Sequence, residues 1–178
     1  MPRLFVAIDL PEEVRRELAG MCCGLPGARW LPPEQLHLTL RFIGEVDSET
    51  QARIIGALAE VVAAPLTLRL RGVGFFPPRG LPRVLWVGVE RCEGLSRLQR
   101  RVEQCLLRAG LAPEGRKFMA HVTLARLHDT PGSRIGSYLA LHNLYASPEI
   151  PVDRFVLYDS ILNPRGARHY PLQDFFLV

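Results

Sequence analysis

The sequence predicts an α+β or mixed α/β fold, and three observations support this prediction. Short runs that are apolar, or that alternate between apolar and polar residues, recur along the 178-residue chain as they do in strands. Segments with apolar residues at helical spacing separate most of these runs, whereas only strands are expected near the end. A short motif at residues 37–40 is matched at residues 121–124, which leads to the hypothesis that the fold consists of two similar lobes.

The first elements follow from local composition. Residues 3–10 form a short apolar run typical of a buried strand. Pro11 and the two acids after it open a helix that continues to residue 21, since proline suits a first turn and acids suit its positive end. Residues 24–33 are rich in glycine and proline and predict a loop. Residues 36–43 alternate with period two and predict a strand that ends at Gly44.

A second helix and two further strands follow. The Ser48-x-x-Gln51 sequence predicts a capping box at the start of a helix that extends to residue 62. Residues 66–71 alternate between leucine and polar residues and predict a strand. A loop rich in proline and glycine at residues 75–82 separates it from an apolar strand at residues 84–89.

The second half of the chain returns to the alternation of helix and strand. Apolar residues at helical spacing predict a helix over residues 95–106, and Gly110 suits its C-terminal end. Residues 118–126 predict a strand that carries the second copy of the motif. We also expect a helix at residues 134–142 and closing strands at residues 155–162 and 170–178.

The chain carries a formal net charge of +4, and arginine supplies nearly all of the positive charge, because Lys117 is the one lysine. Arginine binds phosphate through two parallel hydrogen bonds, so an anionic partner is one explanation and a high-GC coding bias is the other. The four cysteines form no CxxC pair, which argues against a cysteine zinc site and favours reduced thiols in the cytoplasm. We find no signal peptide and no apolar run of membrane-spanning length, and therefore expect no membrane association.

The most specific feature of the sequence is a repeated His-x-Thr-x motif. His37-Leu38-Thr39-Leu40 is matched by His121-Val122-Thr123-Leu124, and the two histidines are 84 positions apart. On a strand, the His and Thr of one motif point to the same face, roughly 6.5 to 7 Å apart. Two such strands facing each other across a groove would bring two imidazoles and two hydroxyls to one cleft.

Two histidines in one cleft can serve as acid and base in the same turnover, because imidazole titrates near neutral pH. Phosphoryl transfer needs little more than this and charge stabilisation of the phosphate oxygens, which hydroxyls and arginines provide. Strict alternation places Arg41 on the face of His37 and Phe42 on the opposite face, among core residues. Arg126 reaches the cleft only if the second motif strand bends or ends near Ala125.

Other site chemistries find less support in the sequence. Two histidines could bind zinc, but no third ligand has a recognisable spacing, and no HExxH, Walker A or GxGxxG motif is present. A Ser-His-Asp arrangement stays open, although no Gly-x-Ser-x-Gly elbow supports it. The remaining histidines, His128, His142 and His169, lack the motif and are expected at the surface or in loops.

These residues resemble the two-histidine phosphoesterase superfamily, and most of all its bacterial and archaeal RNA 2′,3′-cyclic phosphodiesterases, once called 2′-5′ RNA ligases. The likeness includes both motifs, extended to His37–Gly44 and His121–Arg126. It also includes the start of the chain at Arg3–Ile8 and the segment Ser160–Gly166. His169 stands where this family has tyrosine.

The resemblance implies a bilobal α+β fold, with two pseudo-symmetric antiparallel sheets and outer helices around a central cleft, in which residues 1–178 form a single two-lobed phosphodiesterase domain. It implies hydrolysis of RNA 2′,3′-cyclic phosphate ends to 2′-phosphates without metal or cofactor and, in reverse, 2′-5′ ligation. By the same resemblance, His37 is the proton donor and His121 the proton acceptor, although the symmetry of the motifs would allow the reverse. The other candidate residues are Thr39 and Thr123 at the catalytic centre and Arg126, Arg41 and Phe42 as substrate contacts.

Two other functions remain open from the sequence. The chain could be a nucleotide- or RNA-binding module without turnover, or a phosphodiesterase for small cyclic nucleotides or 2′-5′ oligonucleotides. The two intact histidines argue against simple binding, which would need only the threonines and arginines. We expect a cytoplasmic monomer whose partner is RNA or an oligonucleotide with a cyclic phosphate end, with Trp30 as a further candidate for base stacking.

Overall fold

Four helices and ten strands make up the structure, a computed structural model that describes all of residues 1–178. The helices are α1 (Glu12–Gly20), α2 (Ser48–Ala59), α3 (Glu93–Arg108) and α4 (Gly132–His142), with a 3-10 turn, η1, at Pro33–Gln35. The first five strands are β1 (Arg3–Asp9), β2 (Ala28–Trp30), β3 (His37–Glu45), β4 (Leu66–Leu68) and β5 (Leu70–Phe76). The last five strands are β6 (Val84–Val89), β7 (His121–Leu127), β8 (Ile150–Val152), β9 (Arg154–Asn163) and β10 (Gly166–Phe176). Helices with antiparallel strands confirm the predicted α+β class.

Most of the predicted elements are present, and the exceptions have local causes. Strands β2 and β8 have three residues each, too few for an alternating pattern to predict them. The expected strand at residues 66–71 is divided between β4 and β5, which belong to different sheets. The expected capping box at Ser48 is wrong, because the Asp47 carboxylate caps α2 by accepting a hydrogen bond from the Thr50 N–H at 2.7 Å. None of the helices combines the length and apolar character that crossing a membrane requires.

The strands form an eight-stranded antiparallel sheet and a separate two-stranded one made of β4 and β8. In the larger sheet the order is β10-β9-β1-β3-β7-β6-β5, and β2 pairs with β7. We call β10-β9-β1-β3 the sheet of lobe 1, and β7-β6-β5 with β2 the sheet of lobe 2. The one registered pair between them joins Leu38 of β3 to Val122 of β7. The two half-sheets therefore meet along a very short seam.

The pairing register relates the lobes by an approximate two-fold axis. Leu38 pairs with Val122, and Thr67 of β4 pairs with Pro151 of β8; each pair joins positions 84 residues apart. This is also the spacing of the two histidine motifs. Equivalent positions of two copies face each other in an antiparallel pair only where a two-fold axis passes between them. The register therefore supports the hypothesis of two similar lobes.

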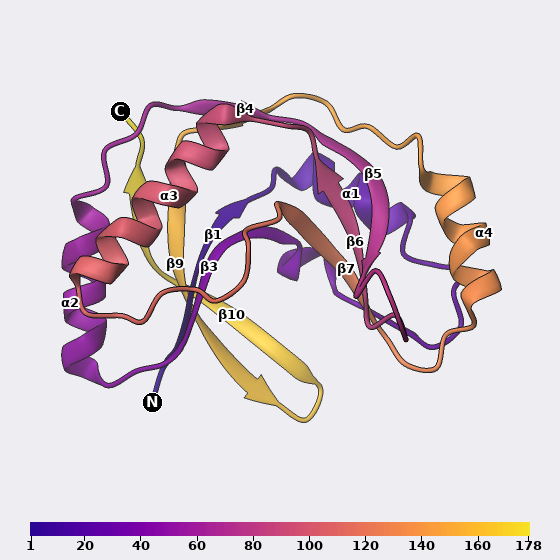
Figure 1. Cartoon of the computed structure of the whole chain (residues 1–178), viewed down its shortest axis with the longest axis horizontal. Helices are drawn as coiled ribbons and strands as arrows, with labels where there is room; N and C mark the ends of the chain where they lie inside the picture. Colours follow the sequence, from indigo (N-terminus) through magenta and orange to yellow (C-terminus); the bar gives the residue numbers. More distant parts are fainter.

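The helices lie on the outside of the two lobes (Figure 1). Helices α2 and α3 pack on each other beside lobe 1, and α4 lies outside lobe 2. The Tyr138 hydroxyl of α4 donates a hydrogen bond of 2.7 Å to the carbonyl of Met21, which follows α1, and so ties α4 to α1. Buried apolar residues of both lobes belong to one hydrophobic cluster. The β9–β10 hairpin projects away from these layers (Figure 1).

Candidate functional site

A β-bulge interrupts each of the two motif strands at the same place. Along the β1–β3 pair, Val6 is opposite Arg41 and Ala7 is opposite Thr39, so Leu40 is an extra residue on β3. Along the β6–β7 pair, Leu85 is opposite Ala125 and Trp86 is opposite Thr123, so Leu124 is an extra residue on β7. A bulge reverses the alternation of side chains beyond it. The residues directly after the fourth motif position, Arg41 and Phe42 on β3 and Ala125 and Arg126 on β7, therefore point to the faces opposite to those that strict alternation predicts, and a second irregularity at Ile43 shifts the register of β3 again.

The bulge in β3 corrects the expected placement of Arg41. Its side chain is 9% exposed and lies on the helix side of the sheet, where its Nε atom is 2.9 Å from Glu103 of α3 and its Nη1 atom 2.9 Å from Glu114. The prediction that Arg41 shares the face of His37 is therefore wrong. Phe42, which alternation places in the core, is 44% exposed on the face of His37.

The equivalent bulge in β7 brings Arg126 to the face of Thr123. A hollow of about 400 Å³ lies on this face between the lobes, and we call it the cleft. Of the predicted site residues, His37, Thr39, Phe42, Thr123 and Arg126 line the cleft. Trp30 of β2, the candidate for base stacking, also lines the cleft. His121, two residues before Thr123 on β7, does not belong to the lining.

The seam between the lobes aligns the two motifs. Because Leu38 pairs with Val122 in an antiparallel register, His37 is opposite Thr123 and Thr39 is opposite His121. Leu38 and Val122 are fully buried on the core side, so the four polar side chains point to the cleft side. The structure thus brings two imidazoles and two hydroxyls together about the two-fold axis.

His37 is enclosed by aromatic rings. Its ring stacks on Phe5 with centroids 4.9 Å apart, and its Nε2 atom is 3.1 Å from the Thr39 hydroxyl. Burial, with smaller effects from the nearby His169 and His121, lowers the pKa of His37 to about 4, although a hydrogen bond to the backbone of Gln35 opposes this shift. His37 is therefore neutral at pH 7 in the free protein.

His121 has a backbone contact similar to that of His37, but different aromatic rings surround it. Its Nδ1 atom lies 2.7 Å from the carbonyl oxygen of Met119, two residues earlier, as Gln35 is two residues before His37. A carbonyl only accepts hydrogen bonds, so Nδ1 carries the proton and Nε2 of neutral His121 is free to act as a base. The neighbouring rings are Phe76, edge-on at 5.1 Å, and Trp86 at 6.4 Å.

His169 is a site residue that the sequence pattern does not identify. It was expected at the surface or in a loop, but it lies on β10, lines the cleft, and meets the His37 ring edge-on with centroids 5.4 Å apart. Its Nδ1 atom is buried without a hydrogen-bond partner, and burial lowers its pKa. The position of His169 depends on the pairing of β10 with β9 more than 120 residues after the first motif, so no local signal marks it. The one indication in the sequence that His169 belongs to the site is that it stands where the family it resembles has tyrosine.

The charge of the cleft is strongly positive. Four arginines line it, and none of their guanidinium groups forms an ion pair: Arg3, Arg29, Arg126 and Arg165. The Arg3 guanidinium lies over the ring of Phe42 at 5.0 Å, which leaves its donors free at the edge. Unpaired arginines around a hollow favour an anionic ligand with several acceptor oxygens. No group of three or more His, Cys, Asp or Glu side chains is arranged to hold a metal ion.

The fold and cleft define a class of protein with two lobes that each supply one His-x-Thr strand to a shared, arginine-rich site. The sequence model of the family described as LigT-like phosphoesterase matches the chain twice, over residues 8–86 and 87–168. RNA 2′,3′-cyclic phosphodiesterases of Archaeoglobus fulgidus and Thermus thermophilus are 35% and 37% identical to the chain. These alignments cover 97% and 98% of this chain and 99% and 90% of the relatives.

Solved structures agree with this assignment. A crystal structure of a Thermus thermophilus protein has a TM-score of 0.81 and 32% identity, and covers 98% of this chain and 97% of that one. E. coli LigT in complex with 3′-AMP has a TM-score of 0.79 and 28% identity, and covers 99% and 98%. The chain belongs to the LigT-like phosphoesterase family, which confirms the resemblance to two-histidine phosphoesterases.

Proposed function

We propose that this protein hydrolyses 2′,3′-cyclic phosphate ends of RNA to 2′-phosphates. The observation that supports this most directly is the facing pair of His-x-Thr strands beside the unpaired Arg126. The names of the relatives give the same activity for proteins that align over nearly the whole chain. The four unpaired arginines of the cleft suit a substrate with more than one phosphate.

In the proposed reaction, Nε2 of His121 takes a proton from water as the water oxygen attacks phosphorus. The bond between phosphorus and the 3′ oxygen breaks, and His37 gives its proton to that oxygen, which leaves a 2′-phosphate. Thr39, Thr123 and Arg126 hold the phosphate oxygens and stabilise the charge that develops on them. With an RNA 5′-hydroxyl in place of water as the nucleophile, the same groups would form a 2′-5′ linkage.

The donor role of His37 requires that substrate binding protonates it. Its pKa of about 4 leaves it neutral in the free protein at pH 7. A phosphodiester anion against the imidazole favours the charged form and so raises this pKa. In this proposal, the phosphate of the bound substrate favours the protonated form of His37, which then donates its proton to the leaving 3′ oxygen.

Residues 1–178 act in this proposal as one catalytic domain and as a cytoplasmic monomer. Each lobe supplies one histidine and one threonine, and a shared hydrophobic cluster joins the lobes, so neither half is expected to act alone. Metal and cofactors have no part in the proposed steps, because the charge stabilisation comes from arginine and hydroxyl donors.

A substrate panel tests the proposed function. Nucleoside 2′,3′-cyclic phosphates, cyclic-ended RNA, 3′,5′-cyclic nucleotides and 2′-5′ linked dimers are incubated with the protein in EDTA, and phosphorus NMR identifies the products. We expect 2′-phosphates from the 2′,3′-cyclic substrates and unchanged rates in EDTA. Turnover of only the 3′,5′-cyclic nucleotides or the 2′-5′ linked dimers would contradict the proposed substrate. Binding without turnover of any of these compounds would favour a binding module.

A further inference from the structure

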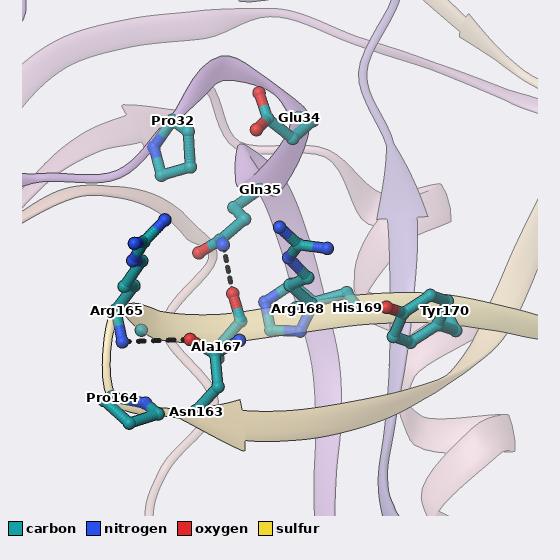
Figure 2. Close-up of a pocket in the computed structure, with 11 residues that line it drawn as sticks. Pro32, Glu34, Gln35, Asn163, Pro164, Arg165, Ala167, Arg168, His169 and Tyr170 are labelled. Atoms are coloured by element: carbon teal, nitrogen blue, oxygen red, sulfur yellow. Dashed lines mark hydrogen bonds between the residues drawn. The ribbon is translucent and has the colours of Figure 1, made fainter.

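A second hollow adjoins the cleft and has no role in the proposed reaction. Its volume is about 700 Å³, within the range of small-molecule binding sites, and we call it the hairpin groove. The segment Pro32–Gln35 forms one wall, and residues 163–170 of the β9–β10 hairpin form the other. Figure 2 shows the side chains of Arg165 and Arg168 rising from the hairpin toward the loop that carries Gln35.

The hairpin groove is continuous with the cleft. The two hollows share six lining residues: Pro32, Gln35, Arg165, Gly166, Ala167 and His169. At the boundary, the Gln35 side-chain amide donates a hydrogen bond to the carbonyl of Ala167, which holds the loop and the hairpin together (Figure 2). A ligand that extends out of the cleft across this contact enters the groove directly.

The chemistry of the groove suits a nucleotide with its phosphate. Arg165 and Arg168 are exposed and form no ion pair, and Glu34 is the one acid in the lining. Tyr170 is 45% exposed at the end of the groove and presents a ring on which a base can stack. A third hollow, behind His37, is less suited to a phosphate backbone, because its two arginines are outnumbered by three acids: Asp9, Glu12 and Glu34.

We propose that the hairpin groove binds the nucleotide that precedes the cyclic end of an RNA substrate, with its phosphodiester at Arg168 and its base against Tyr170. The inference rests on the proposed function, because a 2′,3′-cyclic phosphate is always the 3′ end of its strand. The rest of the strand can then continue only in the 5′ direction, and the groove is the basic exit from the cleft. The protein therefore prefers cyclic-ended oligonucleotides to cyclic mononucleotides.

The test compares kcat/KM for cytidine 2′,3′-cyclic phosphate and for a cyclic-ended trinucleotide. Arg168 lines the groove and not the cleft, so Arg168→Ala is expected to leave hydrolysis of the mononucleotide unchanged. We expect this variant to lower kcat/KM for the trinucleotide on the order of tenfold. The slope of log(kcat/KM) against log salt for the trinucleotide should fall by about 0.7, as for the loss of one phosphate contact with a single strand.

Arg100→Ala is the matched control, because Arg100 is exposed on α3, forms no ion pair, and lies in neither hollow. An equal loss on both substrates with Arg168→Ala, or no loss on either, would overturn the role of the groove. Absence of turnover on both substrates by the unmodified protein would instead contradict the proposed function. In that case, fluorescence anisotropy with a labelled 2′-phosphorylated trinucleotide still measures whether Arg168→Ala weakens binding, and equal binding by both proteins would refute the groove.

Discussion

The two motif strands are equivalent by register, and their histidines differ in what surrounds them. His37 stacks on Phe5, faces His169, and has a pKa lowered to about 4. His121 lies against Phe76 and Trp86 on the other lobe and keeps its Nδ1 atom on a backbone carbonyl. A duplicated motif thus supplies two similar imidazoles, and the packing around each copy makes them different. In the proposed reaction, this difference would distinguish the acid from the base in a site whose local sequence is symmetric.

The cleft residues directly beyond the two bulges also differ between the lobes. Phe42 and Arg126 occupy equivalent cleft positions beyond the two bulges, and one is an apolar ring while the other is a cation. Arg41 and Ala125, one residue earlier, both point to the core side. The lobe with Arg126 therefore presents a positive charge to the cleft, and the lobe with Phe42 presents an apolar surface.

The largest effect is expected when either histidine is removed. His37→Ala and His121→Ala should each lower kcat on cyclic-ended RNA about 10²- to 10⁴-fold, because each removes one of the two proton-transfer groups. Circular dichroism and melting temperature check that the fold is retained, and His128→Ala, an exposed histidine, is the control. Full activity in either single variant would contradict the shared acid–base site.

Arg126 and Arg41 provide the next contrast. Arg126→Ala should lower kcat/KM about 10²-fold with little change in stability, because this guanidinium is unpaired and lines the cleft. Arg41→Ala should instead destabilise the fold by about 2–4 kcal/mol, because it leaves Glu103 and Glu114 without their partner. Urea unfolding and kinetics on both variants measure the two effects. A catalytic loss with Arg41→Ala in fully folded protein would show that Arg41 acts in the cleft and not on the helix side of the sheet.

The lowered pKa of His37 predicts a pH-dependent stability. The unfolded chain holds this histidine near its ordinary pKa of 6.5 and the folded chain at about 4, so the unfolded chain binds more protons between these values. The free energy of unfolding should therefore fall as pH is lowered from 6.5 to 4, by up to about 3 kcal/mol. Urea unfolding of the unmodified protein and of His37→Gln at pH 7, 5.5 and 4 measures the difference. Parallel pH dependence in the two proteins would show that His37 titrates normally.

The smallest effect is expected at His169. His169→Phe keeps an aromatic ring beside His37 and removes a group that can carry positive charge, so the pKa of His37 should rise slightly. Burial, the larger cause of the low pKa, is unchanged by this substitution. An NMR titration of the His37 ring detects the shift, with His142→Phe as a control, because His142 does not line the cleft and does not contact His37. An unchanged or lower pKa would rule out the electrostatic coupling.

Much of the fold and the centre of the site can be predicted from the sequence. The alternation of residues 36–43 and 118–126 identifies both motif strands, and the helical spacing of residues 95–106 identifies α3, because these signals are local. The placement of Arg41, Phe42 and His169 could not be predicted in this way. Each depends on pairing with a strand that is distant in the chain, and single-strand alternation contains no information on that pairing.

The sequence by itself identified the candidate residues for the chemistry, through two copies of a motif with the same spacing and a resemblance to a known family. Only the tertiary structure decided how these copies differ. The bulges at Leu40 and Leu124 lie where β3 pairs with β1 and β7 pairs with β6, and they reverse the faces of the residues directly after them. Burial, with a smaller effect from His169, lowers the pKa of His37, and the rings of Phe5 on β1 and His169 on β10 lie against this histidine only after the sheet has formed.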